Sequence, residues 1–139
     1  MVIKTRKRGG AGGGGFWLNH VFTGSLNAGQ TAYMTLDQHD NPNLTEANVQ
    51  ICVPNGVTKL SAMSVYMTSA NDTYNADITI RKNGNDTSLT IQYTGGQTGY
   101  KDIETDVDVV AGDLINIKVV CGTGGTGVYR PRFIGVKFE

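Results

Sequence analysis

Acidic side chains gather in one segment where they could bind a cation. Asp102, Glu104, Asp106 and Asp108 stand at every second position, so in a strand all four carboxylates would lie on one face. Calcium is usually bound by oxygen ligands of an irregular loop that wraps the ion, whereas alternate residues of a strand lie about 7 Å apart. The pattern is therefore typical of a solvent-exposed strand face, with a cation site as the alternative.

A second polar group belongs to a proline-interrupted stretch that we expect to be a long surface loop. Asp37, His39, Asp40 and Asn43 lie within it and could ligate a cation, although such residues are common in surface loops of every kind. Neither His39 nor His20, the other histidine, has neighbours at ligand-like spacing. We expect the protein to need no metal and no other cofactor.

The sequence carries no recognisable catalytic motif. It lacks H-E-x-x-H, G-x-S-x-G and a P-loop lysine. Residues 122–127 have the glycine spacing of a dinucleotide-binding loop, but the V-Y-R-P-R that follows predicts a strand where such a loop requires a helix. We interpret residues 122–127 as a mobile loop and expect no enzymatic activity.

The cysteines and the apolar pattern bear on the environment of the chain. Cys52 and Cys121 are too few for a disulfide framework and form no C-x-x-C pair, and we expect both to be buried thiols. No run approaches the ~18 apolar residues of a membrane helix, so no membrane partner is expected. The basic start runs into glycine rather than an apolar segment, which favours synthesis in a cytoplasm over secretion.

Charge is unevenly distributed along the chain. The 12 Lys and Arg balance the 12 Asp and Glu, but Lys4, Arg6, Lys7 and Arg8 lie in the first eight positions, which leaves the remainder with a net charge of −4. The glycine-rich residues 9–15 predict that residues 1–15 form a flexible arm. The arm could neutralise the phosphates of nucleic acid or bind an acidic protein surface. Because the rest of the chain is acidic and has no basic stripe, we expect a protein partner and no nucleic acid.

From Phe16 onward the pattern predicts one all-β domain, residues 16–139. Short apolar–polar alternation is broken by glycine, asparagine or proline about every ten residues, which is typical of short antiparallel strands. This number of strands in this length predicts a two-sheet antiparallel jelly-roll sandwich with a flexible N-terminal arm. The predicted strands are Val21–Leu26, Thr31–Leu36, Val49–Val53, Thr58–Thr68, Ala76–Lys82, Ser88–Tyr93, Ile103–Val109, Leu114–Val120 and Arg132–Phe138.

Two turns are predicted from residue type. Asn83-Gly84 accepts the positive φ of a tight turn, so residues 76–93 should form a hairpin. Gly112-Asp113 predicts a second reversal, in which the carboxylate of Asp113 can accept hydrogen bonds from turn amides.

Aromatic residues are the remaining candidates for binding. Phe16, Trp17 and Phe22 should cover one end of the core or dock the end of the arm onto a neighbour. Exposed aromatic rings are also what a glycan-binding protein presents, and the sequence alone does not reveal a cluster among its tyrosines. These are Tyr33, Tyr66, Tyr74, Tyr93, Tyr100 and Tyr129.

Two stretches near the C-terminus together resemble a known family. Residues 107–117, V-D-V-V-A-G-D-L-I-N-I, and residues 133–138, F-I-G-V-K-F, are similar to the last strands of the C1q and tumour-necrosis-factor-like jelly roll. Residues 76–89 are similar to the central hairpin of small bacteriophage virion proteins of this shape. The resemblance covers residues 76–139. It implies a jelly-roll fold and homotrimers.

A short jelly roll with a basic, glycine-hinged arm resembles a tailed-bacteriophage capsid decoration, or cement, protein. The resemblance implies a non-enzymatic structural protein that sits as a trimer on the outer surface of the virion capsid, with the major capsid protein as partner. The alternative is a receptor- or glycan-binding tip domain of a phage tail fibre or spike. In the first interpretation, the capsid-anchoring residues are Lys4, Arg6, Lys7, Arg8, Phe16 and Trp17, and the trimer-interface residues are Ile134, Val136 and Phe138.

Overall fold

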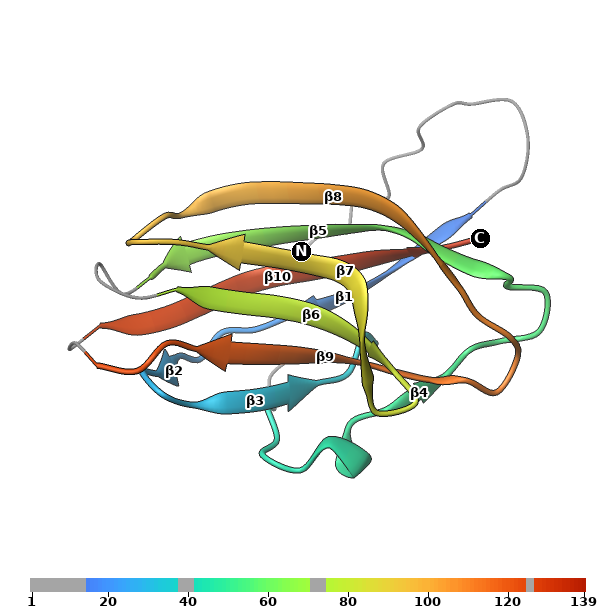
Figure 1. The fold of residues 1–139 in the computed structure, drawn as a ribbon, viewed down its shortest axis with the longest axis horizontal. Coiled ribbons are helices and arrows are strands. Elements are labelled where there is room, and N and C mark those ends of the chain that lie inside the picture. Colours follow the sequence, from blue (N-terminus) through green and yellow to red (C-terminus); the bar gives the residue numbers. More distant parts are fainter. Residues whose placement is uncertain (1–14, 38–41, 71–74, 125–126) are drawn as a thin grey trace.

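The chain folds into two antiparallel β-sheets packed face to face, as seen in a computed structural model (Figure 1). The structure describes residues 15–37, 42–70, 75–124 and 127–139. The predicted arm residues Lys4, Arg6, Lys7 and Arg8 therefore lie outside the described residues, as do His39, Asp40 and Tyr74. Within the described ranges the chain has a single short 3-10 turn, η1 (Glu46–Asn48), and no α-helix. The prediction of an all-β, two-sheet sandwich is confirmed.

Each sheet has five strands. The first sheet has the order β1-β10-β5-β8, with β2 also paired to β10, and the second has the order β3-β9-β6-β7, with β4 also paired to β9. The strands of the first sheet are β1 (Phe16–Val21), β2 (Leu26–Asn27), β5 (Lys59–Ser69), β8 (Gly99–Asp108) and β10 (Val128–Phe138). Those of the second sheet are β3 (Thr31–Met34), β4 (Ile51–Cys52), β6 (Ala76–Lys82), β7 (Asn85–Tyr93) and β9 (Leu114–Cys121).

The connections give the sandwich its topology. When β1 and β2 are counted as one interrupted strand and β3 and β4 as another, eight strands remain, with the order 1-8-3-6 in one sheet and 2-7-4-5 in the other. This is the arrangement of a double-sheet jelly roll. Strands β1 and β8 lie at opposite edges of the first sheet, and β8 passes directly to β9 in the second sheet.

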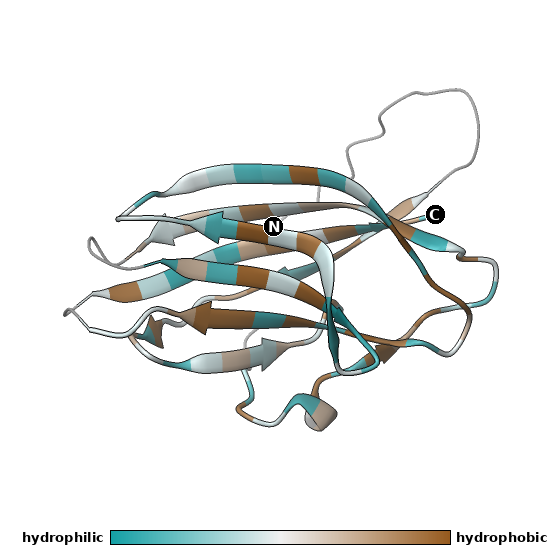
Figure 2. Cartoon of the chain, viewed as in Figure 1, coloured by the Kyte–Doolittle hydropathy of each residue, from teal (hydrophilic) through white to brown (hydrophobic). Residues whose placement is uncertain are grey.

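The core lies between the sheets and is built from the inward-facing side chains of both. Met34, Leu60, Met63, Ile78 and Ile117 have no exposed surface. Apolar residues alternate with polar ones along most strands, so hydrophobic and hydrophilic bands follow each other along the ribbons in Figure 2. Burial of these apolar side chains is the main favourable contribution to folding, at roughly 1.5–3 kcal/mol for each large one.

The predicted strands agree with the structure at most positions. Ala76–Lys82 is found with the predicted bounds, and seven other predictions overlap an observed strand. The prediction Val21–Leu26 meets observed strands only at its two ends, because the first strand is Phe16–Val21 and the chain then bends before β2. Thr23-Gly24-Ser25 interrupts the pairing there, whereas residues 16–21 pair continuously with β10.

Both predicted turns are confirmed. Asn83 and Gly84 have φ angles of 50° and 79°, and they join β6 to β7 as a hairpin. Gly112 has a φ of 91°, and the Asp113 carboxylate accepts a hydrogen bond from the Val110 amide at 2.9 Å. This second turn joins strands of different sheets, because β8 and β9 are not neighbours.

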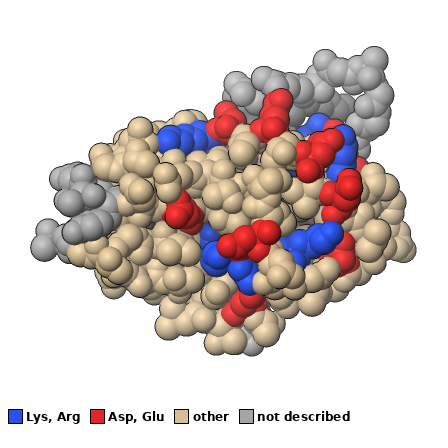
Figure 3. All heavy atoms as spheres, viewed as in Figure 1, with Lys and Arg blue, Asp and Glu red and all other residues tan. Residues whose placement is uncertain are grey.

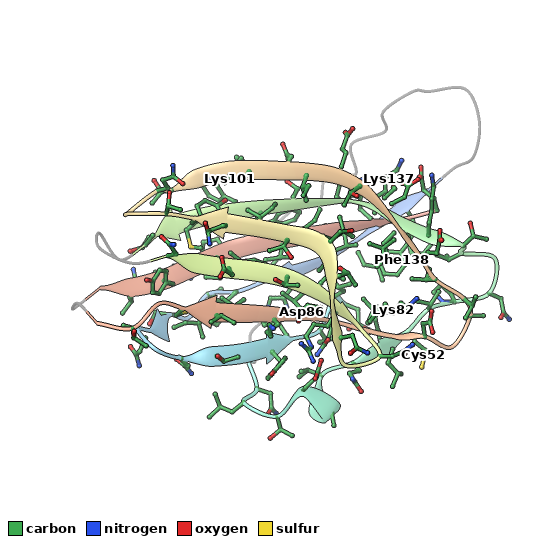
Figure 4. All side chains as sticks on the ribbon, in the orientation of Figure 1. Cys52, Lys82, Asp86, Lys101, Lys137 and Phe138 are labelled. Carbon is green, nitrogen blue, oxygen red and sulfur yellow. The ribbon has the colours of Figure 1, made fainter. Side chains whose placement is uncertain are left out.

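Only one of the two cysteines is buried as predicted. Cys121 is 2% exposed in the core, but Cys52 is exposed. The two-residue strand β4 pairs only with the end of β9, so Cys52 lies near one end of the sandwich (Figure 4). The apolar context of Cys52 in the sequence gave no sign that its strand would be so short.

Candidate binding surface

A row of apolar side chains crosses the outer face of the first sheet. Val21 of β1 is paired with Phe133 of β10, Phe133 with Tyr66 of β5, and Tyr66 with Tyr100 of β8. Because directly paired residues of antiparallel strands place their side chains on the same face, these four form one line across the sheet. We call Val21, Phe133, Tyr66 and Tyr100 the aromatic row.

The aromatic row is partly open to solvent. Tyr66 and Tyr100 stack on each other with ring centroids 4.4 Å apart and an interplanar angle of 22°. Tyr100 is 69% exposed, while Val21, Phe133 and Tyr66 are half-buried. Stacked pairs of this kind are worth about 0.5–1.5 kcal/mol beyond the area they bury, so the two rings hold each other in place.

A shallow depression of about 470 Å³ lies along the aromatic row. Phe22, Thr23 and Arg132 line it together with the four residues of the row. This volume lies within the range of small-molecule sites, about 300–1,000 Å³, and the mixture of aromatic walls with a few polar groups is typical of such sites.

A β-bulge directs Arg132 into this depression. Phe133 pairs with Tyr66 and Pro131 with Met67, so Arg132 is an extra residue that has no partner in β5. Bulges of this kind re-aim a side chain. Nη1 of Arg132 donates to the carbonyl oxygens of Phe22 at 3.1 Å and Gly24 at 3.3 Å, so both bonds use one nitrogen and not the edge of the guanidinium that carries Nε and Nη2.

Small and polar residues lie beside the aromatic row. Asn19, Gly135, Ser64 and Asp102 form the next cross-strand line on the same face. A Cβ atom added to Gly135 would lie 2.7 Å from Oδ1 of Asn19 and 3.1 Å from the ring of Phe133. The absence of a side chain at position 135 therefore lets the Phe133 ring and Asn19 approach the strand closely.

The acidic residues of β8 lie on the exposed side of the strand, as predicted. Asp102, Glu104, Asp106 and Asp108 are all exposed and alternate with half-buried residues. Asp106 pairs with Lys59 at 3.1 Å. Among the described residues, no group of three or more His, Cys, Asp or Glu side chains is placed to hold a metal ion.

The outer face of the second sheet carries charges that neutralise one another. Arg81 of β6 binds Glu46 of η1, with Nε 2.5 Å from Oε1, and also contacts Asp86 of β7. Lys118 of β9 donates to Asp86 at 2.6 Å, and this bond holds the pKa of Asp86 below its usual value. Blue and red atoms accordingly lie next to each other in the centre of this face in Figure 3. These pairs fasten η1 to the sheet, and we assign them a structural role.

The residues predicted for the trimer interface lie elsewhere than expected. Ile134, Val136 and Phe138 have no exposed surface and pack in the core of their own chain. This corrects their assignment, because they offer no side-chain surface to a neighbour. Their alternation marks the inner face of β10, and Phe133, between them and the bulge, belongs to the outer face.

The two aromatic residues predicted to belong to the anchor differ in their surroundings. Phe16 is 42% exposed and stacks on Phe138, with centroids 5.3 Å apart. Trp17 is half-buried on the outer face of the first sheet, where it pairs with Lys137. Phe16 therefore covers one end of the core, as one of the two interpretations predicted.

His20, to which the sequence assigned no role, connects the two sheets. Its ring is 1% exposed, and Nδ1 lies 2.7 Å from the carbonyl oxygen of Thr35, just beyond β3. Since a carbonyl only accepts, Nδ1 carries the proton in this bond. The inward direction of His20 follows from its pairing with Ile134.

Sequence reasoning did not find Arg132, Phe133 or Val21 as site residues. Tyr66 and Tyr100 were candidates, but nothing in the sequence brought them together. Only the register of four strands and the bulge at Arg132 do so. A single sequence carries no pattern from which the register of these strands, or the bulge at Arg132, could have been predicted.

Comparison with other proteins does not identify a family. No family model matches the chain, and no curated protein matches its sequence significantly. Among the described residues, no helix is long and apolar enough to span a membrane.

Proposed function

We propose that this protein is a non-enzymatic virion structural protein that binds the outer surface of a phage capsid and stabilises it as a decoration trimer. The observation that carries the proposal is the aromatic row, a partly exposed apolar line across all four main strands of one sheet. Apolar patches rimmed by polar residues are typical of protein interaction sites, and tyrosine is enriched among the residues that dominate such contacts.

The contrast between the two outer faces supports this assignment. On the second sheet, Arg81, Glu46, Asp86 and Lys118 already satisfy one another. On the first sheet, Tyr100 keeps 69% of its surface exposed. Contact area is therefore available at the aromatic row, whose members form no ion pair with one another, and we propose that the major capsid protein covers it.

The basic residues of the N-terminal segment would provide a second, linked contact. Lys4, Arg6, Lys7 and Arg8 precede β1, which forms one edge of the first sheet. A linked second contact raises the overall affinity without enlarging the first. Exposed ion pairs contribute at most about 1 kcal/mol each, so we assign most of the binding to the sandwich and a salt-sensitive part to these residues.

Binding to capsids tests the proposal. Undecorated heads of the phage whose genome encodes this chain are mixed with purified protein and sedimented, and saturable co-sedimentation is expected. Tyr100→Ser should weaken binding at least ~10-fold, as expected for loss of a buried aromatic contact. Leu44→Ser is the matched control, because Leu44 is 70% exposed, much like Tyr100, but lies outside the aromatic row. Failure of the unmodified protein to bind heads contradicts the proposal.

A second candidate is a receptor- or glycan-binding tip domain, and the depression beside Arg132 favours it. Aromatic rings with a few directed polar groups are the features of a small-ligand site. Both functions use Tyr100, but they differ in the partner that it contacts. Binding to surface glycans of the host, lost in Tyr100→Ser, together with no binding to heads, would favour the tip domain over decoration.

A further inference from the structure

We propose that the depression beside the aromatic row binds a sugar that carries a carboxylate, such as a uronic or nonulosonic acid residue of a surface polysaccharide. This inference rests on the glycan-binding candidate above and names its ligand class. It depends on the aromatic rings, the guanidinium of Arg132 and the position of the acidic strand, which are considered in turn.

The aromatic row supplies an apolar surface suited to a pyranose ring. One face of most pyranoses presents C–H groups and is apolar, while their hydroxyls point outward around the ring. Tyr66 and Tyr100 stack on each other, so they are held in place before a ligand arrives. Tyr100 is 69% exposed, which leaves it free to contact a ligand. Rings that are already ordered lose little conformational entropy on binding.

Arg132 gives the depression its charge preference. Nη1 is held by the carbonyl oxygens of Phe22 and Gly24, so the planar group has a fixed orientation. Neither of these bonds uses Nε or Nη2, which lie side by side on the other edge of the guanidinium. Two parallel donors of this kind match the two oxygens of a carboxylate, whereas a neutral hydroxyl uses only one of them.

The acidic residues of β8 would orient the ligand. Asp102 lies on the same face as Tyr100, two residues further along the strand, which places it about 7 Å away. A carboxylate on the ligand is therefore repelled from the Asp102 side and attracted to Arg132, which is contributed by β10. The sugar ring would then lie over Tyr66 and Tyr100, with its carboxylate at the bulge.

Ligand titration followed by chemical shifts of the ¹⁵N-labelled protein tests the inference. The probes are methyl glucuronide, methyl glucoside and sodium acetate. We expect the glucuronide to bind at least ~10-fold more tightly than the glucoside, as for a charge-assisted hydrogen-bonded pair, and acetate to bind no more tightly than the glucoside. Equal binding of glucuronide and glucoside, or acetate binding as tightly as the glucuronide, overturns the inference.

Substitutions assign the charge preference to one residue. Arg132→Gln should remove the difference between the two glycosides, and Arg132→Lys should restore part of it. Arg130→Gln is the matched control, because Arg130 is an exposed arginine of the same strand that does not line the depression. Tyr100→Ser, at an exposed position, should weaken both glycosides without affecting the fold. An unchanged preference in Arg132→Gln overturns the inference.

A glycan array separates this inference from the function on which it rests. Binding to acidic glycans in preference to neutral ones supports both. Binding to neutral glycans alone overturns the acidic-sugar inference and leaves the glycan-binding candidate standing. Binding to no glycan, with no shifts in the titrations, overturns both.

Discussion

The side-chain amide of Asn83 donates a hydrogen bond of 2.8 Å to Oδ1 of Asp113, across 30 residues of sequence. Oδ1 of Asn83 accepts a hydrogen bond from the backbone amide of Leu114 at 2.8 Å. The backbone amide of Asn83 donates to the backbone carbonyl oxygen of Leu114 at the same distance. Two turns that were predicted separately, Asn83-Gly84 and Gly112-Asp113, are thus fastened to each other. The hairpin of β6 and β7 is thereby linked to the crossover from β8 to β9.

Replacement of Asn83 should destabilise the sandwich for two separable reasons. Asn83→Ala removes the side-chain bonds and places a Cβ-bearing residue without local hydrogen bonding at a φ of 50°, which costs about 1 kcal/mol for the backbone alone. Asn83→Gly removes the same side-chain bonds but adopts this φ without strain. We expect urea unfolding to give the order wild type, Asn83→Gly, Asn83→Ala, from most to least stable. A wild-type or higher stability for Asn83→Gly would contradict a stabilising contact with Asp113.

The contribution of Asp113 should depend on pH. The hydrogen bond from Asn83, then the Val110 amide and the charge of Lys82, hold the pKa of Asp113 below its ordinary value. A carboxyl whose pKa is lower in the folded state stabilises above its unfolded pKa of about 3.9, and this is lost as pH falls through the folded pKa. The stability difference between wild type and Asn83→Gly should therefore be larger at pH 7 than at pH 2. A difference that does not change with pH would contradict this mechanism.

The features that could be predicted are those set by neighbours in the sequence. Strand β6 and the Asn83-Gly84 turn follow from alternation and from residues that accept positive φ. The contact of Asn83 with Asp113 could not be predicted, because it depends on the pairing of β6 with β9, two strands of the same sheet that are far apart in the sequence. Alternation placed Ile134, Val136 and Phe138 on one face but did not say whether that face was inner or outer.

The binding surface could not be predicted from the sequence, because a register shift in β10 changes the direction of Arg132. Arg132 would have been assigned to the opposite face from Phe133 by simple alternation. The register shift between Pro131 and Phe133 makes it line the depression instead. A bulge is the outcome of pairing with a partner strand, so one strand's own sequence did not reveal it.

The two cysteines should react very differently with a thiol reagent. Cys52 is exposed, whereas Cys121 is 2% exposed and its burial raises its pKa to about 12. Since the thiolate is the reactive form, native protein at pH 8 should consume one equivalent of Ellman's reagent, and a second only in denaturant. Cys52→Ser should consume none when native. Rapid labelling of both thiols in native protein would contradict the burial of Cys121.

The hydroxyl of Tyr93 should hold the two sheets together where β7 passes to β8. It lies 2.7 Å from the carbonyl oxygen of Gly99 and 3.0 Å from that of Val65, both in the opposite sheet, and the residue is 1% exposed. Tyr93→Phe leaves both oxygens without this donor, and we expect a loss of about 1–2 kcal/mol in the free energy of unfolding. Tyr100→Phe, at an exposed position, is the matched control and should change stability by less than about 0.5 kcal/mol.

Alkaline unfolding gives a second test of the same bond. Burial raises the pKa of Tyr93 to about 12, against about 10 in the unfolded chain. A group whose folded pKa is raised contributes its full stabilisation below the unfolded value, and this is lost as pH rises through the folded value. Wild type should therefore lose stability between about pH 10 and pH 12 more steeply than Tyr93→Phe. Burial of Cys121 acts in the same direction but is common to both proteins, so the comparison isolates Tyr93. Identical alkaline profiles for wild type and Tyr93→Phe would show that the Tyr93 hydroxyl is not held between the sheets.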